Sequence, residues 1–442
     1  MSRMGDLATF QSADVGPLGS RVGELVRLHA ELWHGASDEP RPLGKSYKRA
    51  EKKAVERELS AVVGELSSPE VREAFLAGAL EPRRIEEMAA ELKPAFKRLL
   101  GLIGLPLDAV YDARFIDSTR RFLQDARAFD PDLRLDSAYQ ALRNVWIMNS
   151  LQFDLGLAVE PTEAVFAYSM VYPYLDNVLD DDRAAEADKL SLVAKLKDWL
   201  EGSDRPAGSP AEQKLRALVA LIERRFPRPA FPGVYRSLLA IHNAQVKSLL
   251  QQRPGATASP DEVLAISFEK GGTSVLADGY LVAGALAPAD EEFCFGFGTF
   301  LQLADDLQDI GEDSRRGQRT LFSAGAGRAV PLDATAARLE NYVVAVIGRA
   351  RRGASPGRAA LCDAIEGGLA LMCRESVGKH PEFFRRPFVR RARRGFPARF
   401  SYLKKLRRRI GDKMPPGVER LADLDAGLVA LMAVSTRAFA LD

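Results

Sequence analysis

The chain has 442 residues, of which 46% are hydrophobic and 28% are charged, and its formal net charge is only +2. This composition excludes a disordered chain and is typical of a globular protein with a sizeable core. No run approaches the roughly 18 to 20 uncharged apolar residues of a membrane-spanning helix, and the first twenty residues lack the apolar centre of a signal peptide, so we expect a cytoplasmic protein.

Helical patterns dominate from the first hundred residues onward. Apolar residues recur at intervals of three and four positions among abundant Ala, Leu, Glu, Arg and Lys, and no convincing alternating strand is present. The clearest examples are residues 45–66, 137–157, 211–226 and 231–252. The sequence therefore predicts an all-α fold.

Three regions follow from the distribution of these patterns. Residues 1–105 are predicted to form an N-terminal helical extension, in which no residue pattern indicates a particular chemistry. Residues 106–380 form the predicted helical core, and residues 381–442 form a basic C-terminal helical segment. We expect the extension to pack on the core or to lengthen it.

A first acidic cluster lies in the segment MVYPYLDNVLDDDR, residues 170–183. Asp176 and Asp180 are one helical turn apart, and Arg183 lies on the same helix face as Asp176. By itself this cluster is weak evidence for a site, because a polar helix end has the same composition. It gains meaning only when a second acidic cluster accompanies it.

Two helix starts are marked by the same local signal. Ser209 and Ser259 each precede a proline, and each is followed three positions later by a glutamate. A serine cap, a proline in the first helical position and an acid in the first turn all favour the start of a helix. We therefore predict that helices begin at residues 210 and 260.

Lys270 lies in the second of these helices, directly before Gly271 and Gly272. Each glycine costs a helix roughly 1 kcal/mol relative to alanine, so the pair predicts a local break. A lysine beside such a break is well suited to bind phosphate oxygens.

The second acidic cluster is the strongest signal in the chain. In FLQLADDLQDIGED, residues 300–313, four carboxylates and an amide follow one helical stripe: Gln302, Asp305, Asp306, Asp309 and Asp313. The intervening residues are apolar, which indicates a largely buried helix, and stacked like charges there require cations. A solvated acidic face is the alternative, but such faces normally contain interleaved Lys or Arg. Further cations follow the stripe at Arg315, Arg316 and Arg319, of which Arg319 is the best candidate for binding phosphate.

The pattern of cysteines and histidines excludes soft metal sites. The three cysteines have no CxxC spacing, and the four histidines form no HxxxH or HExxH pair. Oxygen ligands favour Mg²⁺, which is usually held by one or two carboxylates together with substrate phosphates. Two facing carboxylate helices would therefore bind two or three Mg²⁺ ions, with a diphosphate as the last ligand.

These residues resemble the class I isoprenoid synthase family, which includes trans-prenyltransferases, terpene cyclases and squalene or phytoene synthases. The sequence DDLQD at 305–309 matches the DDxxD motif of that family, and DNVLD at 176–180 resembles its first motif. KGGTS at 270–274 is similar to the segment that binds diphosphate, and Gln245 falls where prenyl synthases carry a pocket glutamine. Motif order and spacing agree over roughly residues 135 to 325.

The resemblance implies an isoprenoid synthase-type helical bundle with extra N- and C-terminal helices. It also implies catalytic, metal-binding roles for Asp176, Asp180, Asp305, Asp306 and Asp309. The residues that would bind substrate are Arg183, Gln245, Lys270, Gln302 and Arg319. The cofactor would be Mg²⁺ and the substrate a prenyl diphosphate, ionised beside an apolar cavity. Candidate walls of that cavity, whose alternative role is ordinary core packing, are Trp146, Phe153, Phe166, Tyr168, Met170 and Tyr172.

Departures from the family pattern weaken the prenyltransferase interpretation. The chain has no GKxxRP segment before the first motif and no paired arginines directly after it. These segments hold the second substrate in chain-elongating synthases, so a terpene synthase is favoured. The alternative is a prenyltransferase of the polyprenyl diphosphate synthase or squalene/phytoene synthase type. A catalytically silent scaffold is a third interpretation, against which the presence of both acidic clusters argues.

The C-terminal segment is unusually basic. Residues 385–410 contain twelve Arg or Lys and no acid. An anionic membrane surface, nucleic acid and the acidic body of the same protein are its alternative partners. Nucleic acid is not expected, because no zinc-finger or RNP signature accompanies the charges, which leaves peripheral membrane contact open. A monomer and a homodimer both remain compatible with the sequence.

Overall fold

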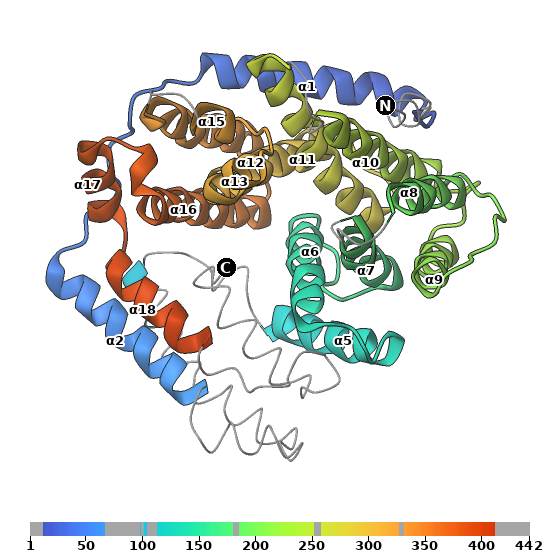
Figure 1. Cartoon of the computed structure of the whole chain (residues 1–442), viewed down its shortest axis with the longest axis horizontal. Helices are drawn as coiled ribbons and strands as arrows, with labels where there is room; N and C mark the ends of the chain where they lie inside the picture. Colours follow the sequence, from blue (N-terminus) through green and yellow to red (C-terminus); the bar gives the residue numbers. More distant parts are fainter. Residues whose placement is uncertain are drawn as a thin grey trace.

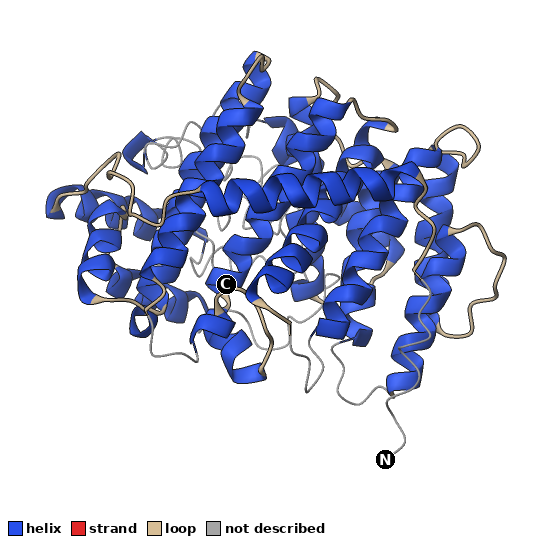
Figure 2. Cartoon of the chain, turned by 90° about the horizontal axis from the view of Figure 1, so that it is seen from above, coloured by secondary structure: helices blue, strands red, loops and turns tan. Residues whose placement is uncertain are grey.

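The fold is built from helices alone in the part of the chain that is described, where no β-strand occurs (Figure 1, Figure 2). The structure is a computed structural model that describes residues 12–66, 98, 101–103, 113–179, 185–251, 258–326 and 331–411. The predicted all-α fold class is thereby confirmed. Within these residues, every helix is too short or too polar to cross a bilayer.

The helices are named as in Figure 1. In chain order they are α1 (Pro17–Gly35), α2 (Arg49–Leu66), α5 (Ala113–Phe129), α6 (Leu135–Asp154), α7 (Glu163–Leu179), α8 (Glu186–Leu200), α9 (Pro210–Arg225), α10 (Pro232–Gln251), α11 (Pro260–Ala283), α12 (Pro288–Gln308), α13 (Ile310–Arg316), α14 (Ser323–Ala326), α15 (Asp333–Ala350), α16 (Pro356–Lys379), the 3-10 turn η3 (Pro381–Phe383), α17 (Arg386–Gly395) and α18 (Phe400–Gly411).

Both predicted helix starts are confirmed. The side chain of Ser209 accepts a hydrogen bond from the backbone N–H of Glu212, and Ser259 accepts one from Glu262. In each case the glutamate carboxylate in turn accepts a bond from the backbone of the serine, which completes a capping box. Helices α9 and α11 therefore begin at Pro210 and Pro260, as expected.

Helices α11 and α12 form the centre of the molecule (Figure 1). The prediction of a break at Gly271 and Gly272 is wrong, because α11 is continuous from Pro260 to Ala283. Both glycines instead allow α12 to approach closely. A Cβ atom on Gly271 or Gly298 would lie less than 3.0 Å from the carbonyl oxygen of the other, and one on Gly272 would meet the Phe295 ring equally closely. The glycines are a packing surface, and close packing outweighs their low helix propensity.

We expect the substitution Gly298→Ala to lower the free energy of unfolding by about 1–3 kcal/mol. The added methyl group meets the backbone of Gly271, which cannot rotate away as a side chain would. Gly348→Ala is the matched control, because Gly348 is an exposed glycine within α15 with open space around it. This control should leave stability unchanged or raise it by up to about 1 kcal/mol. Equal denaturation midpoints for the two variants would contradict the packing assignment.

Helix α1 belongs to the main body of the molecule. It packs against α10, α11, α12 and α15, and Figure 1 shows it running across them. Its buried His29 contributes Nδ1 to a 2.7 Å hydrogen bond with the Tyr342 hydroxyl, which lies 2.7 Å from the Thr299 hydroxyl. Burial lowers the pKa of His29 to about 4, so the ring is neutral at pH 7. The first part of the N-terminal extension is thus joined to the core.

A buried ion cluster ties together three helix ends. Arg358, near the start of α16, donates to Asp154 at the end of α6 at 2.6 Å and to Asp290 near the start of α12 at 2.7 Å. The Asp154 side chain is only 1% exposed, and burial raises its pKa although Arg358 is bonded to it. The hydrogen bond to Asp154 in turn holds the pKa of Arg358 above its ordinary value. Removal of either partner would therefore leave a buried charge without a counter-charge, which destabilises the fold.

A second, smaller hydrophobic cluster joins α2 to residues near the C-terminal end of the described chain. Val55 and Leu59 of α2 pack with Phe396 and with Leu403 of α18, and α2 and α18 lie side by side (Figure 1). Parts of the predicted N-terminal extension and C-terminal segment therefore contact each other. The boundaries placed at 105 and 380 stay predictions, and residue 105 lies outside the described residues.

Candidate functional site

A polar cavity of about 250 Å³ lies where α10, α11, α12 and α13 meet the segment that follows α13. Eleven of its twelve lining residues are polar or charged. They are Ser248 of α10, Ile266, Ser267 and Lys270 of α11, Gln302, Asp305 and Asp306 of α12, Asp309, Asp313 of α13, and Gln318, Arg319 and Thr320. The whole predicted stripe therefore borders one cavity, together with two of the predicted cations.

Asp306 is the most enclosed carboxylate of this cavity, with 5% of the residue exposed. Its Oδ1 accepts a hydrogen bond of 2.8 Å from the Gln302 amide, one helical turn earlier. Its Oδ2 lies 3.4 Å from the Ser267 hydroxyl of α11. Neighbours on both helices therefore hold this carboxylate in place. Gln302, which was predicted to bind substrate, donates its hydrogen bond to this carboxylate.

Burial of acids in this cavity has an electrostatic cost, to which the neighbouring acids add. Burial raises the pKa of Asp306 to about 7, against the opposing effects of the Gln302 hydrogen bond and the Lys270 charge. Burial, followed by the charge of Asp309, raises the pKa of Asp313 to about 6. A bound cation would favour the charged forms of these groups.

Positively charged side chains approach the acidic stripe from two helices. The charge of Lys270 acts to lower the pKa of both Asp306 and Asp313. The close approach at Gly271 brings it to α12, since Gly271 also lies against the Cβ atom of Gln302. From α6, an Nη atom of Arg143 lies 3.4 Å from an oxygen of Asp305. No sequence pattern indicated Arg143, because it belongs to a helix about 160 residues before Asp305.

The donor set fits a hard cation. Carboxylate, amide and hydroxyl oxygens line the cavity, and they are the ligands that Mg²⁺ prefers. In the described part of the chain, no group of three or more His, Cys, Asp or Glu side chains is arranged to hold a metal on its own. A Mg²⁺ site completed by substrate phosphates needs only one or two carboxylates per ion.

Several predicted residues are not placed in the cavity. Asp176 belongs to the last turn of α7, but its side chain is outside the described set, and Asp180 and Arg183 lie outside the described residues altogether. The opposing acidic cluster therefore stays a prediction. Gln245 is partly buried in α10 and does not line the cavity, whereas Ser248, one turn later, does.

The remaining arginines after the stripe point away from the cavity. Arg315 donates to the Gly311 carbonyl oxygen at 3.0 Å, and Arg316 pairs with Glu312 at 2.7 Å. Both are exposed. Gln318 and Thr320, the immediate neighbours of Arg319, line the cavity instead, and neither was predicted from the sequence. Their position on either side of Arg319 was the one signal that could have indicated them.

Most of the candidate apolar wall residues have packing roles. Phe166 packs against the rings of Phe122 and Phe129, and Met170 is completely buried. Trp146 donates its indole N–H to Thr119 at 2.8 Å. Tyr168 is buried and Phe153 partly buried in the same core, whereas the Tyr172 side chain is outside the described set. These contacts therefore support core packing, which is the alternative to a role as cavity walls.

No protein-family model matches the chain, and neither the curated proteins nor the solved structures yielded a match.

Proposed function

We propose that this chain is a magnesium-dependent class I terpene synthase that ionises an allylic prenyl diphosphate and releases diphosphate. The observation that supports this most is the shared cavity of Asp305, Asp306 and Asp309 with Lys270 and Arg319. Carboxylates for a divalent ion and cations for phosphate oxygens are the two groups that diphosphate binding requires. A solvated acidic face, the alternative for the stripe, does not explain a buried Asp306.

Magnesium would be held by oxygen atoms of Asp305, Asp306 and Asp309, with Asp313 near by. When bound, Mg²⁺ neutralises the negative charge of the diphosphate, so that diphosphate becomes a better leaving group. Gln302 fixes the orientation of Asp306 by its hydrogen bond, which removes the need for reorganisation when the ion arrives.

Phosphate oxygens would be bound by the other side of the cavity. Lys270 supplies a point charge, and Arg319 supplies a planar set of N–H donors. Arg319 donates to the Ala258 carbonyl oxygen at 3.1 Å, which anchors its guanidinium at the start of α11. Ser248, Ser267 and Thr320 add hydroxyl donors. No acid or nucleophile of the chain needs to attack the substrate, because departure of the diphosphate is the step that forms the allylic cation.

Incubation of the full chain with C10, C15 and C20 allylic diphosphates tests this function. We expect diphosphate release from at least one of them when Mg²⁺ is present, with a rate at least about 100-fold lower after chelation of the metal. Mass spectrometry should then detect a hydrocarbon or an alcohol. Absence of diphosphate release from every substrate, at any Mg²⁺ concentration, would reject the proposal.

The same incubation separates the prenyltransferase alternative. A terpene synthase consumes the allylic diphosphate alone, whereas a chain-elongating prenyltransferase needs isopentenyl diphosphate as a second substrate. The absence of the GKxxRP segment and of paired arginines after residue 180 favours the first outcome. Products lengthened by one or more five-carbon units would establish the second. Condensation of two identical allylic diphosphates would indicate the squalene or phytoene synthase type.

A further inference from the structure

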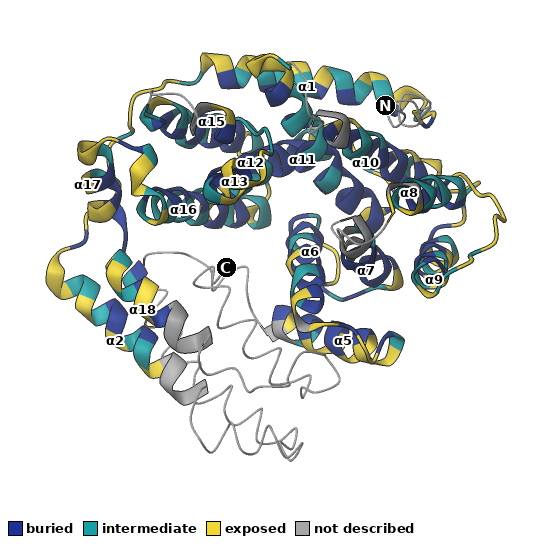
Figure 3. Ribbon diagram, viewed as in Figure 1, coloured by how far each residue is buried: buried dark blue, intermediate teal, exposed yellow. Residues whose placement is uncertain are grey.

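Helix α17 presents a dense row of arginines to solvent. Its opposite face is buried, with Val389 and Ala392 packed into the main core. Figure 3 shows this division along the helix, with exposed and buried positions on opposite sides. The exposed arginines of this helix and its N-terminal flank are Arg385, Arg386, Arg390, Arg393 and Arg394.

The start of α2 extends this row. The backbone N–H of Tyr47 donates to the carbonyl oxygen of Arg394 at 2.9 Å, and the Lys52 ammonium donates to that of Arg393. These bonds join segments about 340 residues apart. They place the exposed Lys48, Arg49 and Lys53 beside the end of α17. We call these three residues and the five exposed arginines the basic surface.

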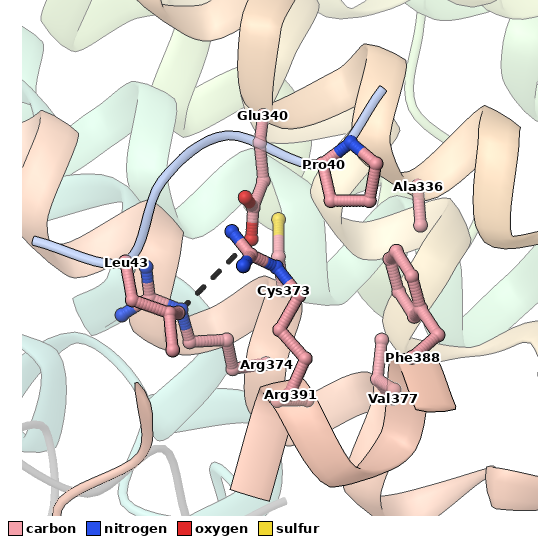
Figure 4. Close-up of a pocket in the computed structure, with 10 residues that line it drawn as sticks. Pro40, Leu43, Ala336, Glu340, Cys373, Arg374, Val377, Phe388 and Arg391 are labelled. Carbon is pink, nitrogen blue, oxygen red and sulfur yellow. Dashed lines mark ion pairs between the residues drawn. The ribbon is translucent and has the colours of Figure 1, made fainter. Parts of the chain in front are cut away.

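The described residues near the basic surface are paired elsewhere or lie inward, and they do not neutralise it. Arg391 is turned inward toward the carboxylate of Glu340, which lies 4.0 Å from Arg374 (Figure 4). Arg399 is bonded to Glu56 through both of its carboxylate oxygens. In contrast, none of the eight side chains of the basic surface forms an ion pair within the described residues. Their charge is available to an external anion.

We infer that the basic surface binds the headgroups of an anionic phospholipid bilayer, without insertion of apolar side chains. Phe384 and Phe396, which flank α17, are buried, and Phe388 of α17 is partly buried and stacks on Phe384. These rings are therefore held by the protein rather than offered to a bilayer or to nucleic acid bases. No zinc-finger or RNP signature accompanies these charges in the sequence, which argues against nucleic acid. A plane of lipid phosphates and carboxylates requires only charge, which a broad surface of Arg and Lys supplies.

Co-sedimentation with vesicles tests this inference. Each basic residue near an anionic surface strengthens binding by about fivefold. The triple variant Arg386→Gln, Arg390→Gln and Arg393→Gln should therefore bind mixed phosphatidylcholine and phosphatidylserine vesicles about 100-fold more weakly. These residues lie one turn apart on the exposed face, so the fold should persist, which circular dichroism would verify. The wild-type chain should lose its binding in high salt and on pure phosphatidylcholine.

A variant of equal charge provides the control. Arg27, Arg225 and Arg352 are exposed and belong to neither α17 nor α2. Their replacement by glutamine should leave vesicle binding within about threefold of the wild type, because screening limits the contribution of distant charges. An equal loss in both triple variants would overturn the inference, as would absence of vesicle binding. Binding of the wild type to duplex DNA or RNA but not to vesicles would overturn it in favour of nucleic acid.

Discussion

Replacement of Asp306 by asparagine should lower the rate of magnesium-dependent diphosphate release by at least about 100-fold. Asparagine has the same shape, and its amide can keep a hydrogen bond to Gln302, so the local packing should survive. What is lost is the negative charge that would hold Mg²⁺ at the most enclosed point of the cavity. The rate should fall while the thermal midpoint stays close to that of the wild type.

Glu312→Gln is the control for this variant. Glu312 belongs to α13, close to the same stripe, but it is exposed and paired with Arg316 outside the cavity. We expect its substitution to change the rate by less than about twofold. An assay of released diphosphate, over a titration of Mg²⁺, measures both variants. A full wild-type rate for Asp306→Asn would remove this cavity from consideration as the reaction site.

Replacement of Arg358 by methionine should lower the free energy of unfolding by about 3–5 kcal/mol. The guanidinium bonds Asp154 and Asp290, and its loss leaves the Asp154 carboxylate almost without solvent and without a counter-charge. Addition of Asp154→Asn to the same chain should restore part of this loss, because the amide needs no counter-charge. Urea denaturation at neutral pH, followed by circular dichroism, measures the change.

Arg351→Met is the control, because it measures what an exposed ion cluster contributes to the free energy of unfolding. Arg351 also pairs with two acids, Asp363 and Glu366, but its side chain is 40% exposed. Solvent screens such pairs, so the expected loss is below about 1 kcal/mol. Equal losses for Arg351→Met and Arg358→Met would mean that burial does not decide the contribution of Arg358.

Local signals in the sequence were sufficient for the all-α class, for two helix starts and for the alignment of the acidic stripe. The capping serines Ser209 and Ser259 act within four residues, so the helix starts could be predicted without knowledge of the fold. The stripe from Gln302 to Asp313 is also local, since helical periodicity alone aligns these side chains. In the folded chain the stripe lines the same cavity as Lys270 and Arg319, which the spacing within one helix could not indicate.

Contacts between distant segments account for what could not be predicted. Gly271 and Gly272 carry a low helix propensity, and only the approach of Gly298 and Phe295 explains why they are in a continuous helix. Arg143 reaches Asp305 across the boundary between α6 and α12, and no local pattern marks such a partner. Ser248 likewise enters the cavity because α10 packs on α11.

The contact between Gly271 and Gly298 limits how the cavity can vary. Two backbones that touch without intervening side chains cannot come closer, and any larger residue at either position drives them apart. The spacing between α11, which carries Lys270, and α12, which carries Asp306, is therefore limited by main-chain atoms at this point. A bulkier ligand would therefore have to be accommodated by smaller side chains in the lining, such as at Ile266, rather than by a change in the spacing of the two helices.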